Sequence, residues 1–243
     1  MQRYFAKQKQ EDTFLLEEKD YHHIKTVMRM KENEKIEVVF QNTLYLACIQ
    51  NVKENMIIKE VKKEENKEKN DFKITLFIPF LKEQKLDFIF QKSTELGVFK
   101  ICLIPLERSV IKSKEEKIDK KIERWSRILK EAAEQSKRLS IPEIEILKDL
   151  ESLRNLSGLN LICSTKNNLK SIKKVMKNHS SFDIINVVIG PEGGLSPHEE
   201  ETLESFGFIP VTLGDRIMRV ETVPLYLMSI LNYEFMEWLI CLF

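Results

Sequence analysis

The first 61 residues alternate between apolar and polar positions with a short period. The runs "EKIEVVF", "TLYLACIQNV" and "MIIKEV" contain β-branched residues and are separated by turns rich in Asn and Lys, which predicts strands. One helix interrupts them, because the apolar residues from Ile24 to Met28 have helical spacing, and Asp20 is its predicted N-cap. The pattern therefore predicts a small, barrel-like β domain at the amino terminus.

A charged segment, residues 62–71, separates this region from a different pattern. It has no hydrophobic residue and balanced charge, which is typical of a linker or an exposed hairpin tip. Beyond it, apolar runs such as "FKITLFIPF" and "IINVVIG" predict buried strands, and segments of helical period lie between most of them. Alternating strands and helices predict an α/β domain with a parallel sheet covered on both faces, so we divide the chain into domains 1–71 and 72–243. The predicted helices of the second domain are 84–96, 117–138, 167–178 and 196–206.

The charges of the chain nearly cancel. Its 243 residues include 39 Lys and Arg against 38 Asp and Glu, so any contact with nucleic acid requires a local basic patch. The four cysteines lie far apart without a C-x-x-C or Cys/His cluster, so we expect no metal site, no disulfide framework, and reduced thiols in the cytoplasm. The amino terminus lacks the apolar segment of a signal peptide, and "WLICLF" near the carboxyl terminus is too short to span a membrane.

Four of the seven glycines lie in two loops that follow predicted strands. These are residues 190–194, "GPEGG", and residues 213–222, "LGDRIMRVET". Ligands of open α/β sheets bind beyond the carboxyl ends of the strands, and glycine lets the backbone approach a ligand closely. The sequence contains neither a P-loop nor a G-x-G-x-x-G motif, so the common phosphate-binding patterns are absent. The alternative is a pair of tight turns, with Ser196 and Glu199 forming a capping box at the start of a helix.

The strings "IGPEGGLSPHE" and "LGDRIMRVET" resemble the RsmE family, the bacterial 16S ribosomal RNA uracil-N3 methyltransferases of the SPOUT superfamily. The segments "MQRYF", "HHIKTVMRMKENEKIEV", "KLDFIFQKSTELGV", "PLERSV" and "RWSRILKEAAEQSKRLSIPEI" match further family blocks in the right order, so the resemblance covers nearly the whole chain. Three positions depart from the family pattern. Val220 replaces the usual threonine and lacks its hydroxyl, Pro224 replaces a small residue but is compatible with a first helical turn, and Asn33 replaces a turn glycine.

The resemblance implies a PUA-like β-barrel followed by a SPOUT domain, which contains a parallel sheet and a trefoil knot and forms a homodimer. It also implies that the knot loops bind S-adenosylmethionine, whose adenine is suited to apolar side chains on its faces and backbone groups at its edges. The implied cofactor-binding residues are Cys163, Ser164, Gly190, Pro191, Glu192, Gly193, Gly194, Leu213, Gly214, Ile217, Met218 and Thr222. Local support for a homodimer comes from an apolar carboxyl-terminal helix, 221–242, with Leu225, Met228, Leu231, Phe235, Trp238 and Leu242 at helical spacing.

The implied reaction transfers a methyl group from a sulfonium to N3 of uracil, which carries a proton at neutral pH. Either a base removes this proton or a cation stabilises the negative charge that develops on the uracil oxygens. Arg219 and Arg216 are the candidate cations. Glu221 is a candidate base, and the alternative for it is a favourable interaction with a helix N-terminus. Since transfer needs an in-line approach, we expect much of the catalysis to come from positioning.

Residues 107–138 supply a local basic segment, with 11 Lys and Arg against 7 Asp and Glu. Such a helix presents either a solvated charged face or an RNA-binding surface. His23 alone is equally compatible with a helix surface or a core position. The target base has to leave its stack to expose N3. The resemblance favours RNA contacts by Arg3, His23, Arg29, Lys85, Lys92, Glu95, Arg108, Arg124, Gln135 and Arg138.

Two other functions are compatible with the same sequence. A related SPOUT methyltransferase acting on another RNA, such as transfer RNA, would have the same cofactor loops. A non-catalytic RNA-binding assembly factor would have lost them, and the intact "GPEGG" and R-x-E-T strings argue against such decay. The expected partner is therefore 16S ribosomal RNA, alone or within the small ribosomal subunit.

Overall fold

The computed structural model describes the chain except for residues 53–54, 65–71, 110–117, 167–168, 178–182 and 236–243. The chain forms two compact units. The first contains residues 1–69 together with 130–141, and the second contains residues 70–129 together with 142–243. The segment 130–141 thus belongs to the first unit. No sequence pattern within the first 71 residues predicts that a later segment of the chain packs with them.

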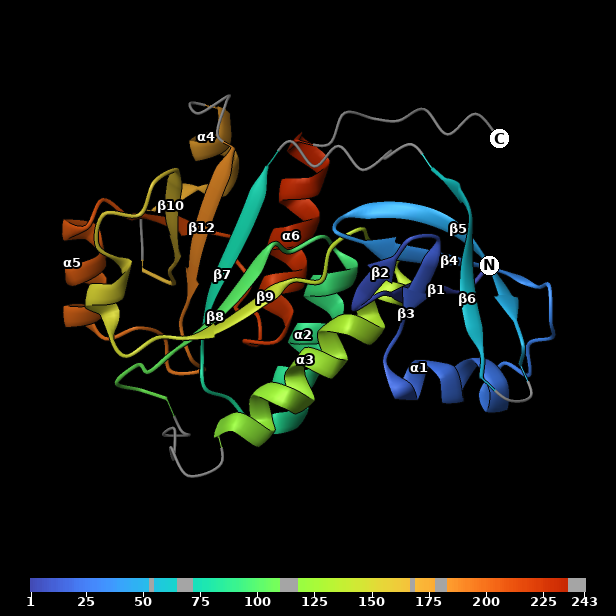
Figure 1. Cartoon of the computed structure of the whole chain (residues 1–243). Coiled ribbons are helices and arrows are strands. Elements are labelled where there is room, and N and C mark those ends of the chain that lie inside the picture. The colour runs from blue at the N-terminus through green and yellow to red at the C-terminus, as the bar shows by residue number, and fades with distance from the viewer. Residues whose placement is uncertain (53–54, 65–71, 110–117, 167–168, 178–182, 236–243) are drawn as a thin grey trace. The chain divides into compact units, whose positions relative to one another are not determined.

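A six-stranded sheet forms the first unit, with the order β1-β4-β5-β6-β3-β2 (Figure 1). Only the β1–β4 pair is parallel. Alternate residues of β5, namely Tyr45, Ala47 and Ile49, are buried, which is the period-two pattern expected of a strand with one face on a core. The three predicted strands are confirmed as β4 (Lys35–Phe40), β5 (Thr43–Gln50) and β6 (Ile57–Lys63). The unit also contains β1 (Arg3–Phe5), β2 (Gln8–Gln10) and β3 (Thr13–Leu15), which the sequence pattern did not predict.

The helix of the first unit begins earlier than predicted. It comprises α1 (Glu18–His22) and a π-helical turn, η1 (His23–Val27), and Glu17 is its N-cap. The prediction of Asp20 as the N-cap is therefore wrong. Asp20 is the third helical residue, its carboxylate accepts the Glu17 amide at 3.3 Å, and its side chain is buried.

Buried ion pairs attach residues 130–141 to the rest of the first unit. The Lys130 ammonium lies 2.7 Å from a carboxylate oxygen of Asp20 and 2.8 Å from one of Glu134. Burial alone would lower the pKa of Lys130, but its hydrogen bonds to these two carboxylates outweigh burial and raise the pKa. Because these charges are removed from water, their mutual pairing is needed to keep them ionised there.

A seven-stranded sheet forms the second unit, in the order β11-β13-β10-β12-β7-β8-β9. Every neighbouring pair is parallel, which confirms the predicted parallel sheet. The strands are β7 (Lys73–Pro79), β8 (Lys100–Ile104), β9 (Glu143–Ile146), β10 (Leu159–Cys163), β11 (Lys170–Ser171), β12 (Ile184–Ile189) and β13 (Ile209–Thr212).

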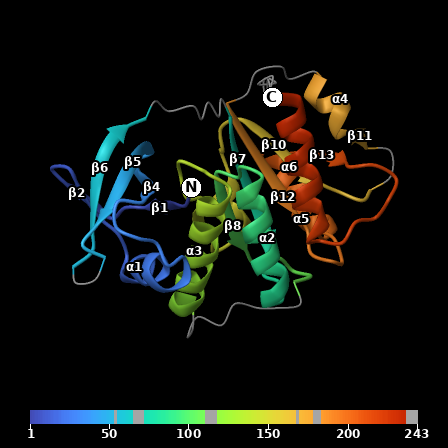
Figure 2. The same cartoon turned by 90° about the vertical axis from the view of Figure 1, so that its right-hand side faces the viewer.

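Helices cover both faces of this sheet. Phe77, Ile162 and Val188 face a core cluster that includes Leu153 of η3 (Leu150–Leu153) and Leu203 of α5 (Pro197–Ser205). Successive residues of a strand point to opposite faces of the sheet. The buried residues next to Phe77, Ile162 and Val188 in their strands therefore face the helix layer on the other side. That layer contains α2 (Glu83–Glu95) and α6 (Thr222–Phe235), which lie side by side (Figure 2).

Two helix predictions need correction. Of the described residues 169–177, only α4 (Ile172–Lys177) is helical and β11 (Lys170–Ser171) precedes it, so the prediction of a helix is wrong at residues 169–171. The predicted helix 117–138 is α3 (Ile118–Gln135), which ends three residues early. The predicted helix 196–206 is observed as α5. In the predicted carboxyl-terminal helix 221–242, the positions Trp238 and Leu242 lie outside the described residues.

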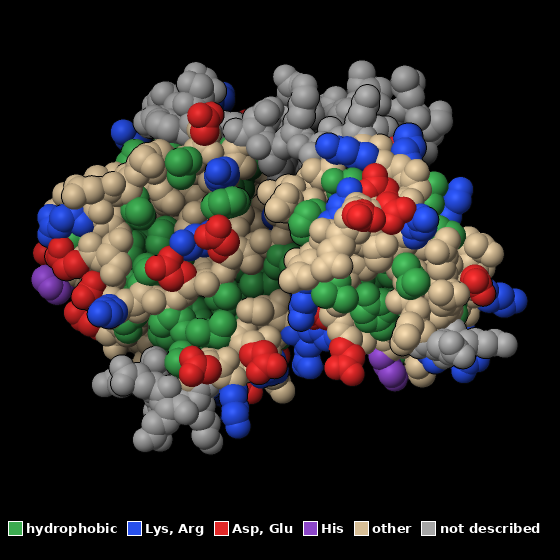
Figure 3. All heavy atoms as spheres, in the orientation of Figure 1, with side chains coloured by type: hydrophobic (Ala, Val, Ile, Leu, Met, Phe, Trp, Pro, Cys, Tyr) green, Lys and Arg blue, Asp and Glu red, His purple; other side chains and the backbone are tan. Residues whose placement is uncertain are grey.

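Acidic and basic side chains are mixed on the visible face of each unit (Figure 3), in keeping with the net charge of +1. Within the described ranges, no helix combines the length and the apolar character that a membrane crossing requires. The same ranges contain no group of three or more His, Cys, Asp or Glu side chains arranged to hold a metal ion.

Candidate active site

Three predicted walls of the cofactor pocket follow three adjacent strands. The order β13-β10-β12 places β10 between the two strands that precede the glycine loops. In the register, Cys163 at the end of β10 pairs with Ile189 of β12 and with Val211 of β13. Because the strands are parallel, their carboxyl ends meet at one edge of the sheet. Residues 163–164, 190–194 and 213–214 therefore lie together, as a cofactor site at this edge requires.

The loop 190–194 is a turn, and its own backbone geometry requires glycine at two positions. A Cβ on Gly190 would lie 2.9 Å from the backbone nitrogen of Leu195, because the loop folds back on itself. Gly194 has a φ of 71° and donates its amide to the Pro191 carbonyl at 2.8 Å. Gly193 differs, since a Cβ there would make only an ordinary contact of 3.5 Å with Arg108. Of the three glycines, only Gly193 is not required by the geometry of the turn.

The capping box predicted at the start of α5 is confirmed and extends further than the sequence indicates. Glu199 accepts the Ser196 amide at 2.7 Å, and Ser196 accepts the Glu199 amide at 3.2 Å. The second oxygen of Glu199 accepts the Glu107 amide at 2.7 Å. This bond ties the chain after β8 to the beginning of α5.

Arg108 holds the same loop from the chain after β8. Its guanidinium donates to the carbonyl of Gly193 at 2.8 Å and to that of Leu195 at 3.1 Å. The sequence resemblance assigns Arg108 to RNA, whereas the structure places its donors on the backbone of the predicted cofactor loop. A planar guanidinium suits two neighbouring carbonyls better than a lysine ammonium does.

The wall after β10 is supported by a buried glutamate that the sequence reasoning missed. Ser164 donates its hydroxyl to Glu200 at 2.9 Å, and the Lys166 ammonium lies 2.5 Å from the other oxygen of Glu200. The only indication in the sequence is an acidic residue directly after the capping box. Burial raises the pKa of the neighbouring Cys163 thiol to about 12, so this thiol is neutral at physiological pH.

The loop 213–222 presents exposed side chains beside these walls. Ile217 has 89% of its surface exposed, and Gly214 has a φ of 124° with open space where a Cβ would be. Arg216 and Arg219 are also exposed. Val220 is buried, so the methyl group that replaces the family's hydroxyl is shielded from water. Pro224 is the third residue of α6, within the first turn as predicted, where no intrahelical amide bond is lost.

Lys85 of α2 contacts both loops. Its Nζ lies 2.6 Å from Oε1 of Glu192 and 3.1 Å from Oε2 of Glu221. The hydrogen bond to Glu192 raises the pKa of Lys85 against the opposing effect of burial, and Glu221 adds to the increase. Lys85 in turn lowers the pKa of Glu192. Partial burial opposes ionisation of Glu221, but its own backbone amide and Lys85 outweigh burial and lower its pKa.

The RNA-binding candidates of the first unit fall into buried and exposed groups. Arg3 is buried, donates to Glu37 at 2.9 Å and to the Arg138 carbonyl at 3.1 Å, and also contacts the Lys137 carbonyl. The Arg138 side chain is buried as well. His23 shares a hydrogen bond of 2.9 Å between its Nδ1 and the Tyr4 hydroxyl. Arg29 and Gln135 are exposed.

The remaining candidates lie in the second unit, on α2 and on the part of α3 before residue 130. Lys92 and Glu95 form an ion pair of 2.9 Å along α2. Arg124 of α3 lies 3.0 Å from Glu83 and also contacts Asp87, both on α2. Each of these cations therefore has a carboxylate partner, which reduces the positive charge that it offers to a phosphate.

Comparison with known proteins identifies the class. Residues 67–232 match a family model described as an RNA methyltransferase domain, and residues 16–62 match one described as an RNA methyltransferase PUA domain. The chain is therefore an RNA methyltransferase with an amino-terminal PUA domain, and the predicted α/β architecture is confirmed.

Relatives along the whole chain define the family. The ribosomal RNA small subunit methyltransferase E of Bacillus subtilis is 33% identical, covering 96% of this chain and 97% of its own. That of Mesomycoplasma hyopneumoniae is 36% identical, covering 94% and 98%. The crystal structure of the Neisseria gonorrhoeae enzyme bound to S-adenosyl methionine is similar with a TM-score of 0.85 and 28% identity, covering 96% and 97%. The chain belongs to the ribosomal RNA small subunit methyltransferase E family, RsmE, as its sequence motifs predicted.

Proposed function

We propose that the protein transfers the methyl group of S-adenosylmethionine to N3 of one uracil in the decoding region of 16S ribosomal RNA. The observation that carries this proposal is the convergence of residues 163–164, 190–194 and 213–214 at one edge of a parallel sheet. Family membership supports the reaction class, because the relatives are named as ribosomal RNA small subunit methyltransferases.

Two features of the site support binding of the cofactor. Ile217 is an exposed apolar side chain that can cover one face of an adenine ring, together with Leu213 and Met218. The open space above Gly214 lets a flat group approach the backbone closely. When bound, S-adenosylmethionine supplies the electrophilic methyl group. The implied cofactor residues, from Cys163 to Thr222, are proposed on these grounds.

The exposed arginines of the second loop are the proposed catalytic cations. Arg219 and Arg216 lie five and two residues after Gly214, on the loop that leads into α6. A guanidinium beside the uracil oxygens stabilises the negative charge that appears as N3 loses its proton. Arg219 is the first choice because the next residue, Val220, is buried and anchors its backbone.

RNA binding is proposed for exposed residues of each unit. In the first unit, Arg29 and Gln135 remain open to a nucleic acid. In the second unit, Lys92, Glu95 and Arg124 lie on two packed helices and provide a mixed polar surface. Within the first unit, Arg3, His23 and Arg138 are proposed to support the exposed residues from within, since their polar groups bind the protein itself.

We further propose a homodimer, a trefoil knot around the glycine loops and a cytoplasmic location where ribosomal RNA is available. Only part of the predicted apolar stripe of the last helix is available for a dimer contact. Met228 and Leu231 are buried within the unit, whereas Tyr226 and, on the adjacent α2, Phe88 remain exposed. Sedimentation of the purified protein tests this: a monomer at micromolar concentration contradicts the dimer.

The decisive experiment is transfer of a labelled methyl group. Purified protein is offered small ribosomal subunits, naked 16S RNA and transfer RNA from a strain that lacks the gene, and the labelled nucleotide is mapped. We expect label at N3 of a single uridine in the decoding region. Label on transfer RNA would favour a related methyltransferase that acts on transfer RNA. If calorimetric titration detects no binding of S-adenosylmethionine, the non-catalytic assembly factor is favoured.

Arg219→Ala is expected to lose turnover but keep cofactor affinity. Full turnover in this variant would remove Arg219 from the mechanism.

A further inference from the structure

Lys85 is the side chain that joins the two cofactor loops. It extends from the first turn of α2, and its Nζ contacts Glu192 of the loop after β12 and Glu221 directly before α6. These two glutamates come from separate loops, and their contacts with one nitrogen place them within roughly 6 Å of each other, where like charges interact strongly. The exposed fractions are 28% for Lys85, 46% for Glu192 and 19% for Glu221.

The arrangement argues against direct binding of RNA phosphate by Lys85. The Lys85 ammonium and its two carboxylates together carry a net charge of −1, and the further cations that act on them are Lys82 on Glu192 and Arg219 on Glu221. A phosphate approaching Lys85 would meet both carboxylates, and this repulsion opposes binding. Lys85 therefore acts first on the two loops, and the RNA role that the sequence resemblance favours for it lacks support from these contacts.

We propose that Lys85 is a positioning residue that holds the loops 190–194 and 213–222 at the spacing needed to bind S-adenosylmethionine. The proposal rests on the proposed function, because it takes S-adenosylmethionine as the ligand between these loops. Without the ammonium, Glu192 and Glu221 repel each other and drive the loops apart. The bridge also gives Glu192 a role that the glycine loop alone does not explain.

The same contacts assign Glu221 to the bridge. A general base for N3 must take up a proton near neutral pH, and a carboxylate paired with an ammonium holds protons weakly. The lowered pKa of Glu221, in which its own backbone amide and Lys85 outweigh burial, agrees with this assignment. Stabilisation of the uracil charge then falls to the exposed arginines of the same loop.

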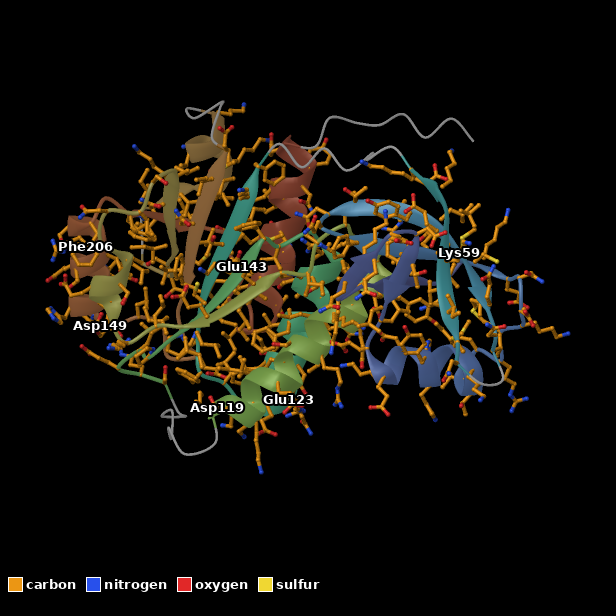
Figure 4. The ribbon with its side chains drawn as sticks, viewed as in Figure 1. Lys59, Asp119, Glu123, Glu143, Asp149 and Phe206 are labelled. Atoms are coloured by element: carbon orange, nitrogen blue, oxygen red, sulfur yellow. The ribbon has the colours of Figure 1, made fainter. Side chains whose placement is uncertain are left out.

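Calorimetric titration of the full-length protein with S-adenosylmethionine tests the bridge. We expect Lys85→Met to weaken binding about tenfold or more, equivalent to about 1.4 kcal/mol. The charge-matched double variant, Lys85→Met with Glu192→Gln, is expected to recover part of this loss because one of the two repelling charges is gone. Lys85→Arg should retain most of the affinity. Lys59→Met is the matched control, because Lys59 (labelled in Figure 4) belongs to the first unit and also forms an ion pair, with Asp12 at 3.1 Å.

The outcomes separate this proposal from the proposed function. Lys85→Met with wild-type cofactor affinity, or with reduced affinity only for an RNA fragment from the decoding region, overturns the bridge. A wild-type protein that fails to bind S-adenosylmethionine overturns the function and the bridge together. If Lys85→Met does not fold, Lys85→Gln takes its place in the same comparison: an effect of Glu192→Gln that is the same with Lys and with Gln at position 85 shows no coupling and overturns the bridge.

Discussion

Substitution of the three loop glycines by alanine separates the demands of the turn from those of the ligand. A Cβ on Gly190 would lie 2.9 Å from the Leu195 nitrogen and 3.1 Å from the Gly194 carbonyl carbon, both in the backbone. Neither atom can rotate away as a side chain can, so the loop has to open by several tenths of an ångström. Overpacking of this kind costs about 1–3 kcal/mol, which corresponds to a fall in melting temperature of roughly 3–10 °C for a unit of this size.

The neighbouring glycines provide controls with the same substitution. At Gly194 the added Cβ meets open space, but the φ of 71° costs a side chain about 1–2 kcal/mol. At Gly193 the contact of 3.5 Å is ordinary, so stability should change by less than about 0.5 kcal/mol. Scanning calorimetry of the three variants measures the order of stability. If Gly190→Ala is as stable as Gly193→Ala, the backbone contact does not govern this turn and the reasoning fails.

Three further predictions concern other contacts. Arg108→Ala removes donors from the Gly193 and Leu195 carbonyls and should weaken cofactor affinity several-fold in calorimetric titration, with RNA affinity retained; the opposite result makes Arg108 an RNA ligand. Lys130→Met leaves buried carboxylates unpaired, so urea denaturation should show a loss of about 3–5 kcal/mol, and a loss below about 1 kcal/mol would contradict the role of these ion pairs. Cys163, with a thiol pKa of about 12, should resist iodoacetamide at pH 8 and react faster as pH rises toward 12, as peptide mapping would show; rapid labelling at pH 8 contradicts the raised pKa.

Local patterns in the sequence determined much of the fold. Apolar alternation predicted β4, β5 and β6, and the near-continuous apolar runs predicted the buried parallel strands of the second unit. The capping box of Ser196 and Glu199 predicted where α5 begins. These features depend on residues within a few positions of one another, so a sequence displays them directly. The prediction of Asp20 as an N-cap was wrong because the N-cap and the third residue of a helix are both favoured sites for a carboxylate.

Only the tertiary structure decided which residues far apart in the chain serve the same site. Lys85 and Glu192 are separated by 107 positions, and Arg108 and Gly193 by 85, so no local pattern links them. The sequence motifs placed Lys85 and Arg108 on an RNA surface, whereas strand order brings both onto the loop 190–194. The glycines of that loop show the same division. The sequence determined that the loop is unusual, and the folded backbone decided that Gly190 and Gly194 serve the turn while Gly193 remains open, because a close approach depends on where distant atoms lie.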